Sequence, residues 1–238
     1  MAQAIILTNI CRRTWERGLF AGTNGNISLR MGNTICITCH GAAKGDLGPN
    51  DLLALDLRSG CRLHPNCTKQ PSAEAAMRLA VYNSQPKAGA VLHTHPPHLL
   101  ALELIVPPKK FLYLPTSESE AKIGRLNLLS EYWPDSSDLA KTIPKVLNTR
   151  ALQTQAKPVP IRPSQPTPLT QLATATPPNH LCRRPPDNNS GRRQPKSRIP
   201  ARHGLVCWGR TPAEALAFTE ELDHLAHIQL LVRQARED

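Results

Sequence analysis

The sequence lacks the features that mark membrane and exported proteins. No apolar run in its 238 residues approaches the ~20 residues of a transmembrane helix, so a membrane span is not expected. The opening stretch MAQAIILTNICRRTWERG has neither the basic start nor the small-residue cleavage site of a signal peptide. Seven cysteines is an odd number and, without an export signal, they are expected to be reduced thiols in the cytoplasm.

Acidic residues are scarce in one part of the chain. The formal net charge of +11 would ordinarily suggest an anionic partner such as nucleic acid. Residues 151–202, however, hold nine Lys or Arg and a single Asp, whereas the rest of the chain holds 20 basic and 17 acidic residues. The body of the protein therefore has an ordinary charge balance, and nucleic acid is not expected as its partner.

The same segment, 151–202, holds eleven prolines and lacks hydrophobic periodicity. This composition predicts a disordered insert that acts as a solvated linker. Two alternatives stay open, namely a basic tail that binds nucleic acid through its phosphates and a reading-frame error within an orderly fold. The predicted organisation is a main part at 1–150, the insert, and a strand and helix at 203–238 that complete the same domain.

Helices and strands alternate in the rest of the chain, which predicts an α/β fold in layers around one sheet. Helices are expected at 3–19, 72–84, 96–104, 135–148 and 211–235. Strands are expected after the turn at 22–26 and at 34–38, 52–57, 88–95, 111–114 and 204–209. Ser72 is a candidate N-cap, and Thr211 is another, with Pro212 at the first helical position. The residues expected to face the core are Ile6, Ile10, Trp15 and Leu19 in the first helix and Ala76, Leu79 and Ala80 in the second.

The stretch CITCHG at 36–41 has the Cys-x-x-Cys-His spacing that attaches a c-type haem. Haem attachment normally needs export, and the apolar residues of NTICITCHG alternate as in a strand that ends in a loop. Zinc on Cys36 and Cys39 is not favoured either, because the second pair, Cys61 and Cys67, has the wrong spacing for a finger or ribbon. A strand running into a loop is therefore predicted.

A candidate metal site begins with His93 and His95 in AVLHTHPPH. Residues two apart on a strand point to the same face, so the two imidazoles can share one ion. His203, before another predicted strand, is the candidate third ligand, and three histidines leave an open position that suits catalysis. Such an ion can polarise a carbonyl and stabilise an enediolate. His98, beyond two prolines, is expected to be an outer-shell or solvent-facing residue.

Glu74 lies in the first turn of the helix predicted at 72–84. A carboxylate there is often only a partner of the helix dipole. Beside a divalent ion it could instead bind the metal and then act as a general acid or base when substrate arrives.

Several ordered stretches resemble the class II aldolase/adducin head family: GLFAGTNGNISLR, ITCHGAAKGDLGPNDLLALDL, PSAEAAMRLAVYNSQPKAGAVLHTHPPH and ARHGLVCWGRTPAEAL. The family includes fuculose- and rhamnulose-phosphate aldolases, ribulose-phosphate 4-epimerase and methylthioribulose-phosphate dehydratase. The resemblance covers roughly 1–150 and 203–238. It implies a three-layer α/β/α fold with a nine-stranded, mainly antiparallel sheet, and a homotetramer with a zinc-type site between subunits.

The resemblance also implies residue roles. His93 and His95 match the paired metal ligands, His203 the third ligand, and Glu74 the catalytic acid/base. Tyr113, after the predicted fourth strand, is a candidate proton donor.

Three phosphate-binding loops are implied as well. Thr23 and Asn26 match the first, His40 and Gly41 the second, and Ser72 part of the third. Backbone N–H groups in such turns form anion-holding nests.

Three departures from the family pattern are visible. His40 replaces a small hydroxyl residue, and Ala73 replaces a frequent serine. The stretch PKSRIPARHG does not supply the apolar strand that the family usually has before its His-Gly pair.

Together these observations predict a cytoplasmic, metal-dependent aldolase. It would cleave a carbon–carbon bond in a small, phosphorylated hydroxy-carbonyl compound with one divalent ion, Zn²⁺ first among the candidates. A sugar-phosphate epimerase or dehydratase using the same site is one alternative. A catalytically inactive, adducin-like interaction domain is the other.

Overall fold

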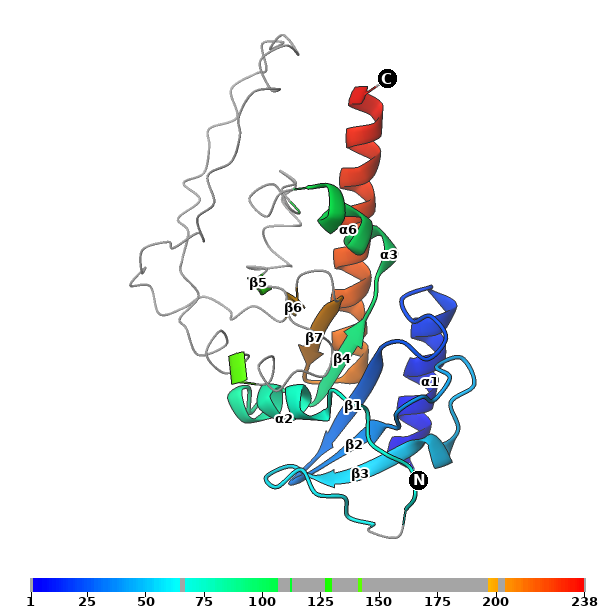
Figure 1. Cartoon of the computed structure of the whole chain (residues 1–238), viewed down its shortest axis with the longest axis vertical. Coiled ribbons are helices and arrows are strands. Elements are labelled where there is room, and N and C mark those ends of the chain that lie inside the picture. Colours follow the sequence, from blue (N-terminus) through cyan, green and yellow to red (C-terminus); the bar gives the residue numbers. More distant parts are fainter. Residues whose placement is uncertain are drawn as a thin grey trace, which may run out of the picture. The chain divides into compact units, whose positions relative to one another are not determined.

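Helices and a seven-stranded sheet make up the part of the chain that the computed structural model describes, which is residues 2–64, 67–106, 112, 127–129, 141–142, 197–200 and 204–237 (Figure 1). These elements lie in one unit formed by Met1–Asn148 and Arg193–Asp238. The helices are α1 (Ala2–Glu16), the short 3-10 helix η1 (Pro49–Asp51), α2 (Ala75–Ser84), α3 (Pro97–Ile105) and α6 (Pro212–Glu237). The strands are β1 (Asn26–Met31), β2 (Thr34–Thr38), β3 (Leu52–Asp56), β4 (Ala90–Thr94), β5 (Asn127–Leu129), β6 (Ser197–Pro200) and β7 (Leu205–Gly209).

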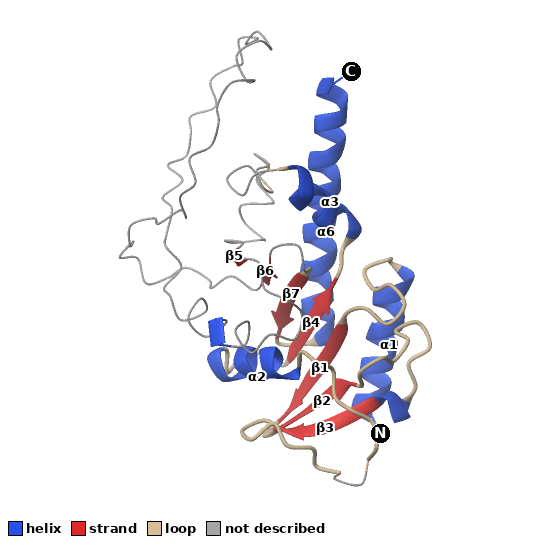
Figure 2. Cartoon of the chain, in the orientation of Figure 1, coloured by secondary structure: helices blue, strands red, loops and turns tan. Residues whose placement is uncertain are grey.

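The strand order is β3-β2-β1-β4-β7-β6-β5 (Figure 2). All neighbours are antiparallel except β5 and β6, which confirms the expectation of a mainly antiparallel sheet. The described residues contain seven of the nine strands that the resemblance implies. β4 lies between β1 and β7, so Asn26 is paired with His93 and Leu205 with Thr94. The sheet therefore brings the first residues of β1 and β7 next to the end of β4.

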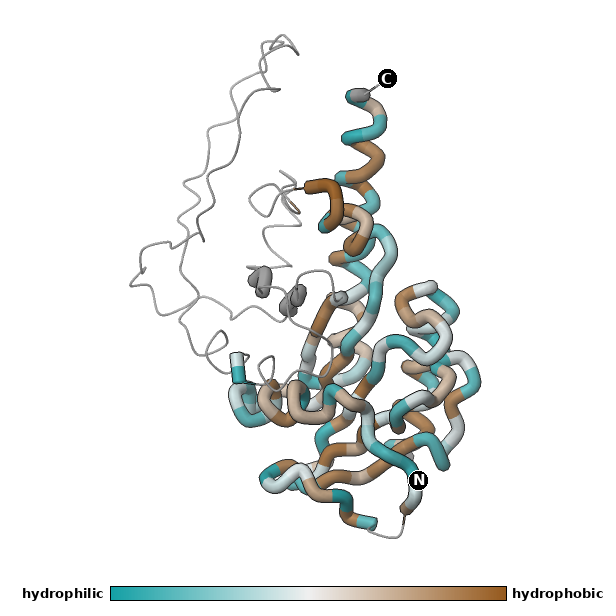
Figure 3. The backbone as a smooth tube through the Cα atoms, viewed as in Figure 1, coloured by the Kyte–Doolittle hydropathy of each residue, from teal (hydrophilic) through white to brown (hydrophobic). Residues whose placement is uncertain are grey.

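Alternation along the strands builds a core on each face of the sheet. Ile35, Ile37 and Val91 pack with α2, whereas Cys36 and Leu92 lie on the other face with α1 and the start of α6. A third cluster joins α3 and α6 to β7. Hydrophobic and hydrophilic residues alternate along α6, as expected of a helix with one buried side (Figure 3). The α/β/α layering predicted from the sequence is confirmed.

Cys36 and Cys39 belong to cores on opposite faces of this sheet. Residues three apart on a strand diverge in this way, so the two thiols cannot clamp one haem or one zinc ion. The six cysteines in the described residues are free thiols.

The predicted buried face of the first helix is partly wrong. Leu7, Ile10 and Cys11 are buried against the sheet, whereas Ile6 and Trp15 are 45% and 47% exposed. Leu7, Ile10 and Cys11 share a buried cluster with Ile27 of β1 and Cys36 of β2, so tertiary packing determines which side of the helix is buried.

The second helix also differs from its prediction. Ser72 is not the N-cap, because α2 starts at Ala75 with Glu74 in the capping position. The amide of Ser72 donates to the carbonyl of Thr38, which holds this stretch against β2 and delays the helix. The buried residues of α2 are Met77, Arg78, Val81 and Tyr82. Of the predicted stripe, Leu79 and Ala80 are partly buried against the same core, whereas Ala76 is exposed.

The start of α6 was predicted correctly. The helix begins at Pro212, and the hydroxyl of Thr211 accepts a hydrogen bond from the amide of Glu214 at 3.1 Å. No helix among the described residues has the length and apolar character needed to cross a membrane.

A short strand lies near the end of the segment 151–202. Ser197–Pro200 forms β6, which pairs antiparallel with β7 and parallel with β5. No apolar strand was expected from the sequence before His203, and β6, with the sequence SRIP, fills this place because main-chain pairing with β7 does not require apolar side chains. The rest of 151–202, the strand predicted at 111–114, except residue 112, and all but two residues of the helix predicted at 135–148 lie outside the described residues.

Candidate metal centre and active site

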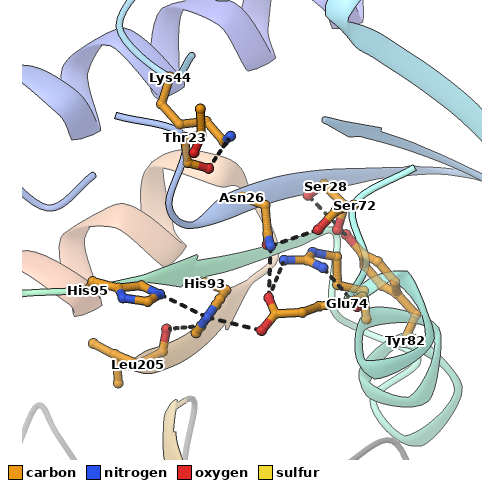
Figure 4. A network of polar contacts seen from close by, with 11 residues as sticks. Thr23, Asn26, Ser28, Lys44, Ser72, Glu74, Tyr82, His93, His95 and Leu205 are labelled. Carbon is orange, nitrogen blue, oxygen red and sulfur yellow. Dashed lines mark hydrogen bonds and ion pairs between the residues drawn. The ribbon is translucent and has the colours of Figure 1, made fainter. Parts of the chain in front are cut away.

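The two histidines of the HTH stretch face each other at the end of β4 (Figure 4). Nε2 of His93 and Nε2 of His95 are 3.3 Å apart, and the two rings meet edge to face. The amide of His95 donates to the carbonyl of Leu19, which fixes the chain where it leaves the strand. The period-2 argument from the sequence thus describes the local arrangement correctly.

A backbone carbonyl sets which nitrogen of His93 faces the site. Nδ1 of His93 lies 3.1 Å from the carbonyl oxygen of Leu205 in β7, so Nδ1 carries the proton and Nε2 presents its lone pair. Metal-binding histidines are commonly oriented in this way by a partner of the other ring nitrogen. His93 is 1% exposed, so this orientation is held in a dry environment.

Glu74 approaches the same point from α2. Its Oε1 lies 3.4 Å from Nε2 of His93, and the residue is buried. A carboxylate oxygen and a lone-pair nitrogen at this distance repel each other unless a proton or a cation lies between them. The donor set therefore fits a divalent ion held by the two imidazoles, with the carboxylate beside it.

The other oxygen of Glu74 is held by Asn26 and Arg78. The side-chain amide of Asn26 donates to Oε2 at 2.8 Å and to the hydroxyl of Ser72 at 2.9 Å. Nη2 of Arg78 lies 3.8 Å from the same Oε2. Two groups on one side of the carboxylate leave Oε1 directed toward His93.

The loop predicted as the second phosphate loop is tied to the segment before α2. The main-chain amide of His40 donates to the carbonyl of Gln70, and the backbones of Cys39 and Pro71 pair in an isolated antiparallel β-bridge. These main-chain contacts place His40 and Gly41 next to the stretch that carries Ser72. Gly41 has φ +70°, the left-handed conformation that glycine adopts in such turns.

Thr23 is linked to the same loop through a residue that the sequence analysis did not select. Lys44 donates from Nζ to the carbonyls of Thr23 and Ala42 at 2.9 and 2.6 Å. Lys44 is 1% exposed, and burial lowers its pKa below the ordinary value. Lys44 lies in a Gly/Ala-rich stretch that is typical of a surface loop, so the local sequence did not predict that it would be buried near the site.

Arg78 is the second residue that the sequence did not reveal. It is fully buried on α2, and Nη1 donates to the carbonyl of Glu74 at 2.8 Å. Burial lowers the pKa of Arg78 to about 10, opposed by the charge of Glu74, so the guanidinium stays charged at neutral pH. A charged residue on a helix normally marks the exposed side, which explains why Arg78 was overlooked.

His98 lies apart from the pair formed by His93 and His95, as its position beyond Pro96 and Pro97 suggested. Its Nδ1 is 2.8 Å from Oδ2 of Asp223 on α6, and its ring stacks on His227. Oδ1 of Asp223 also accepts from the amides of His98 and Leu99, which caps the start of α3.

Two predicted site residues, Tyr113 and His203, lie outside the described residues. Within the ranges that the structure does describe, no group of three or more His, Cys, Asp or Glu is arranged to hold a metal ion. The described part of the site therefore contains two of the three predicted ligands, together with Glu74. Asn26, Ser72, Glu74, His93 and His95 form one connected cluster.

Comparison with known proteins gives this cluster a family. The model of the "Class II Aldolase and Adducin N-terminal domain" matches residues 6–158 and 189–230. The chain belongs to this family.

Relatives and solved structures agree with the assignment. The chain is 26% identical over 230 residues to the methylthioribulose-1-phosphate dehydratase of Enterobacter sp. (strain 638), covering 96% of this chain and 94% of the relative. It is 31% identical over 135 residues to the L-fuculose phosphate aldolase of Methanococcus maripaludis, covering 56% of this chain and 70% of the relative. The crystal structure of L-fuculose-1-phosphate aldolase from Thermus thermophilus matches with a TM-score of 0.67 at 19% identity, covering 98% and 95% of the two chains. That last likeness establishes the class II aldolase fold.

Proposed function

We propose that this protein is a metal-dependent lyase that cleaves a carbon–carbon bond in a small, phosphorylated hydroxy-carbonyl compound. The observation that carries the proposal is the buried carboxylate of Glu74, whose Oε1 lies 3.4 Å from Nε2 of His93 while Oε2 is held by Asn26. A carboxylate that is fixed at one oxygen and directed toward metal ligands at the other suits proton transfer at a polarised carbonyl.

His93 and His95 would hold the ion, with His203 as the third ligand. Zinc is the first candidate, because imidazole nitrogens with one open position are a common zinc set in enzymes. When bound, the ion supplies a Lewis acid that polarises the substrate carbonyl.

The remaining work falls to side chains of this chain. Glu74 takes the proton from the substrate hydroxyl as the carbon–carbon bond breaks and returns a proton to the fragment that carries the negative charge. Asn26 and Arg78 keep Oε2 occupied, so that Oε1 is the oxygen that exchanges the proton. The turn at Thr23 and Asn26, the loop at His40 and Gly41, and Ser72 would bind the phosphate.

A dehydratase is the second candidate, favoured by one observation. The dehydratase of Enterobacter aligns with nearly the whole chain, at 96% coverage. Elimination of water also begins with removal of a proton next to a carbonyl, so Glu74 could serve unchanged while a hydroxyl leaves instead of a carbon fragment. An inactive interaction domain is less well supported, because burying the carboxylate of Glu74 and the imidazole of His93 together carries a desolvation cost that a non-catalytic domain has no reason to keep. Assembly as a homotetramer, which the resemblance implies, and a location in the cytoplasm are part of the proposal.

The test supplies the metal-loaded protein with two substrates. L-fuculose 1-phosphate reports aldol cleavage through release of an aldehyde, and methylthioribulose 1-phosphate reports dehydration through loss of one water by mass spectrometry. Turnover of the first supports the aldolase, and turnover of the second alone supports the dehydratase.

Glu74→Gln keeps the size of the side chain but removes its titrating oxygen. We expect it to retain metal and to lower kcat by ~10²–10⁴-fold. Glu16→Gln, on the exposed Glu16 of α1, is the matched control and should leave kcat unchanged. Activity within a few-fold of wild type in Glu74→Gln would refute the role of Glu74.

A further inference from the structure

Lys44 connects two loops that are far apart in the sequence. Its ammonium donates to the carbonyl of Thr23 in the first loop (Figure 4). It also donates to the carbonyl of Ala42 in the second loop. Its own amide donates to the carbonyl of Gly22 at 3.0 Å. Two of these hydrogen bonds therefore hold the turn at 22–26 against the loop at 40–44, and the bond to Ala42 lies within the second loop.

The charge of Lys44 is not matched by a carboxylate. Among the described residues, no Asp or Glu forms an ion pair with it, and the nearby Asp51 is paired with Lys69 at 2.7 Å instead. A buried charge without a counter-ion is costly, since two carbonyl dipoles replace only part of its hydration.

Arg78 is a second buried cation, and it adds to the positive charge near Lys44. The charge of Arg78 acts on Lys44, and Nε and Nη2 of Arg78 have no hydrogen-bond partner within the described part of the chain. The only carboxylate that contacts Arg78 is Glu74, among the residues that the structure describes. Two buried cations and one carboxylate leave a net positive charge behind the loops.

We infer that Lys44 is a positioning residue for the phosphate group of the substrate. It sets the spacing of the two loops, whose backbone amides face the anion, and its charge is balanced when the phosphate binds. The inference rests on the proposed function only in taking the substrate to be a phosphate monoester. It adds a residue that lies outside the loop positions matched to the family.

Binding of inorganic phosphate tests this without turnover. The dissociation constant of phosphate is measured by calorimetry on the metal-loaded protein, with sodium chloride used to keep the ionic strength constant. Lys44→Met removes the charge and the donors but keeps the length of the side chain. We expect phosphate to bind Lys44→Met about tenfold to a hundredfold more weakly than wild type.

Two comparison variants separate charge from general damage. Lys69→Met removes an exposed lysine next to the same loops and should change the phosphate affinity by less than about twofold, as expected for a screened surface charge. Lys44→Arg keeps the charge and should recover most of the affinity lost in Lys44→Met. Wild-type affinity in a folded, metal-containing Lys44→Met would overturn the inference, as would an equal loss in Lys44→Arg.

If Lys44→Met does not fold, amide hydrogen exchange of the wild-type protein with and without phosphate tests the inference instead. Phosphate should protect the amides of 22–26 and of 40–44 together, and protection of neither loop would overturn the inference. A protein that binds phosphate through Lys44 but turns over neither substrate refutes the proposed function alone. Turnover with an unchanged KM in Lys44→Met refutes only the role of Lys44.

Discussion

The side-chain amide of Asn26 donates a hydrogen bond to Oε2 of Glu74 over 2.8 Å. The two residues are 48 positions apart in the chain and meet because Asn26 begins β1 opposite His93 at the end of β4. The resemblance alone placed Asn26 in a phosphate loop. In the structure its amide group also links that loop directly to the carboxylate of Glu74 and to the hydroxyl of Ser72.

Asn26→Ala should therefore lower catalysis rather than folding. A hydrogen bond to a charged group contributes ~1.5–3 kcal/mol, so kcat/KM is expected to fall by about tenfold to a hundredfold while the metal content stays at the wild-type level. Steady-state kinetics and metal analysis of the same preparation check both statements. Asn33→Ala, which removes an exposed amide bonded to Asp56, is the control and should be neutral. Equal kinetics in the two variants would contradict the assignment.

The histidine pair makes a second prediction. His93→Ala or His95→Ala removes one of two converging imidazole nitrogens, so the affinity for Zn²⁺ should fall by more than about 100-fold, beyond the loss usual for an outer-shell partner. Plasma emission analysis after dialysis against a weak chelator measures this loss. His98→Ala is the matched control, because His98 faces Asp223 instead of the pair. A full metal complement in the double variant His93→Ala/His95→Ala would show that the ion binds elsewhere.

Local patterns were enough to predict the elements that carry the histidines. Alternation predicted β2, the apolar stretches at 88–95 and 204–209 predicted β4 and β7, and the Thr211–Pro212 pair predicted the start of α6, because these signals depend on neighbours in the chain. The same reasoning put Ile6 and Trp15 on the wrong side of α1 and Ser72 at the start of α2. Those choices depend on contacts with strands elsewhere in the sequence.

Local sequence patterns did not predict which polar residues are buried in the site. A lysine in a glycine-rich loop and an arginine on a helix are both ordinary surface residues by composition, yet Lys44 and Arg78 are buried. Lys44 is buried through a partner distant in the sequence, the carbonyl of Thr23, which is brought near by the fold. Arg78 bonds to Glu74 only four residues away, and it is buried because this side of α2 packs against the sheet.

The cysteines give a prediction that depends on pKa. Burial raises the pKa of Cys11 and of Cys207 to about 12 and that of Cys36 to about 11, so these thiols are not ionised at pH 8. Iodoacetamide at pH 8 should modify the exposed Cys61 within minutes and leave Cys11, Cys36 and Cys207 unmodified in the native protein. Peptide mass spectrometry follows each site, and guanidinium should make all of them reactive. Labelling of Cys207 at the rate of Cys61 would mean that β7 is open to solvent.

The last prediction concerns Gly204, which packs against both histidines of the pair. It has φ +119°, and a Cβ at this position would lie 2.5 Å from the carbonyl oxygen of Thr94 and 3.2 Å from ring carbons of His93 and His95. Gly204→Ala must therefore move β7 away from β4 or turn the imidazoles out of position. Both movements disturb the contact between His93 and Leu205 that orients the ring.

Gly32→Ala separates this steric effect from backbone strain. Gly32 also has a positive φ, +61°, but nothing lies within 4 Å of an added Cβ. Gly32→Ala should cost only the left-handed strain of ~1–2 kcal/mol, lowering Tm by a few degrees and leaving metal binding intact. Gly204→Ala should lower Tm further and weaken Zn²⁺ binding by at least about tenfold, because the ligands themselves are displaced. Calorimetry and zinc titration of the two variants measure the difference, and wild-type zinc affinity in Gly204→Ala would show that the site tolerates displacement of β7.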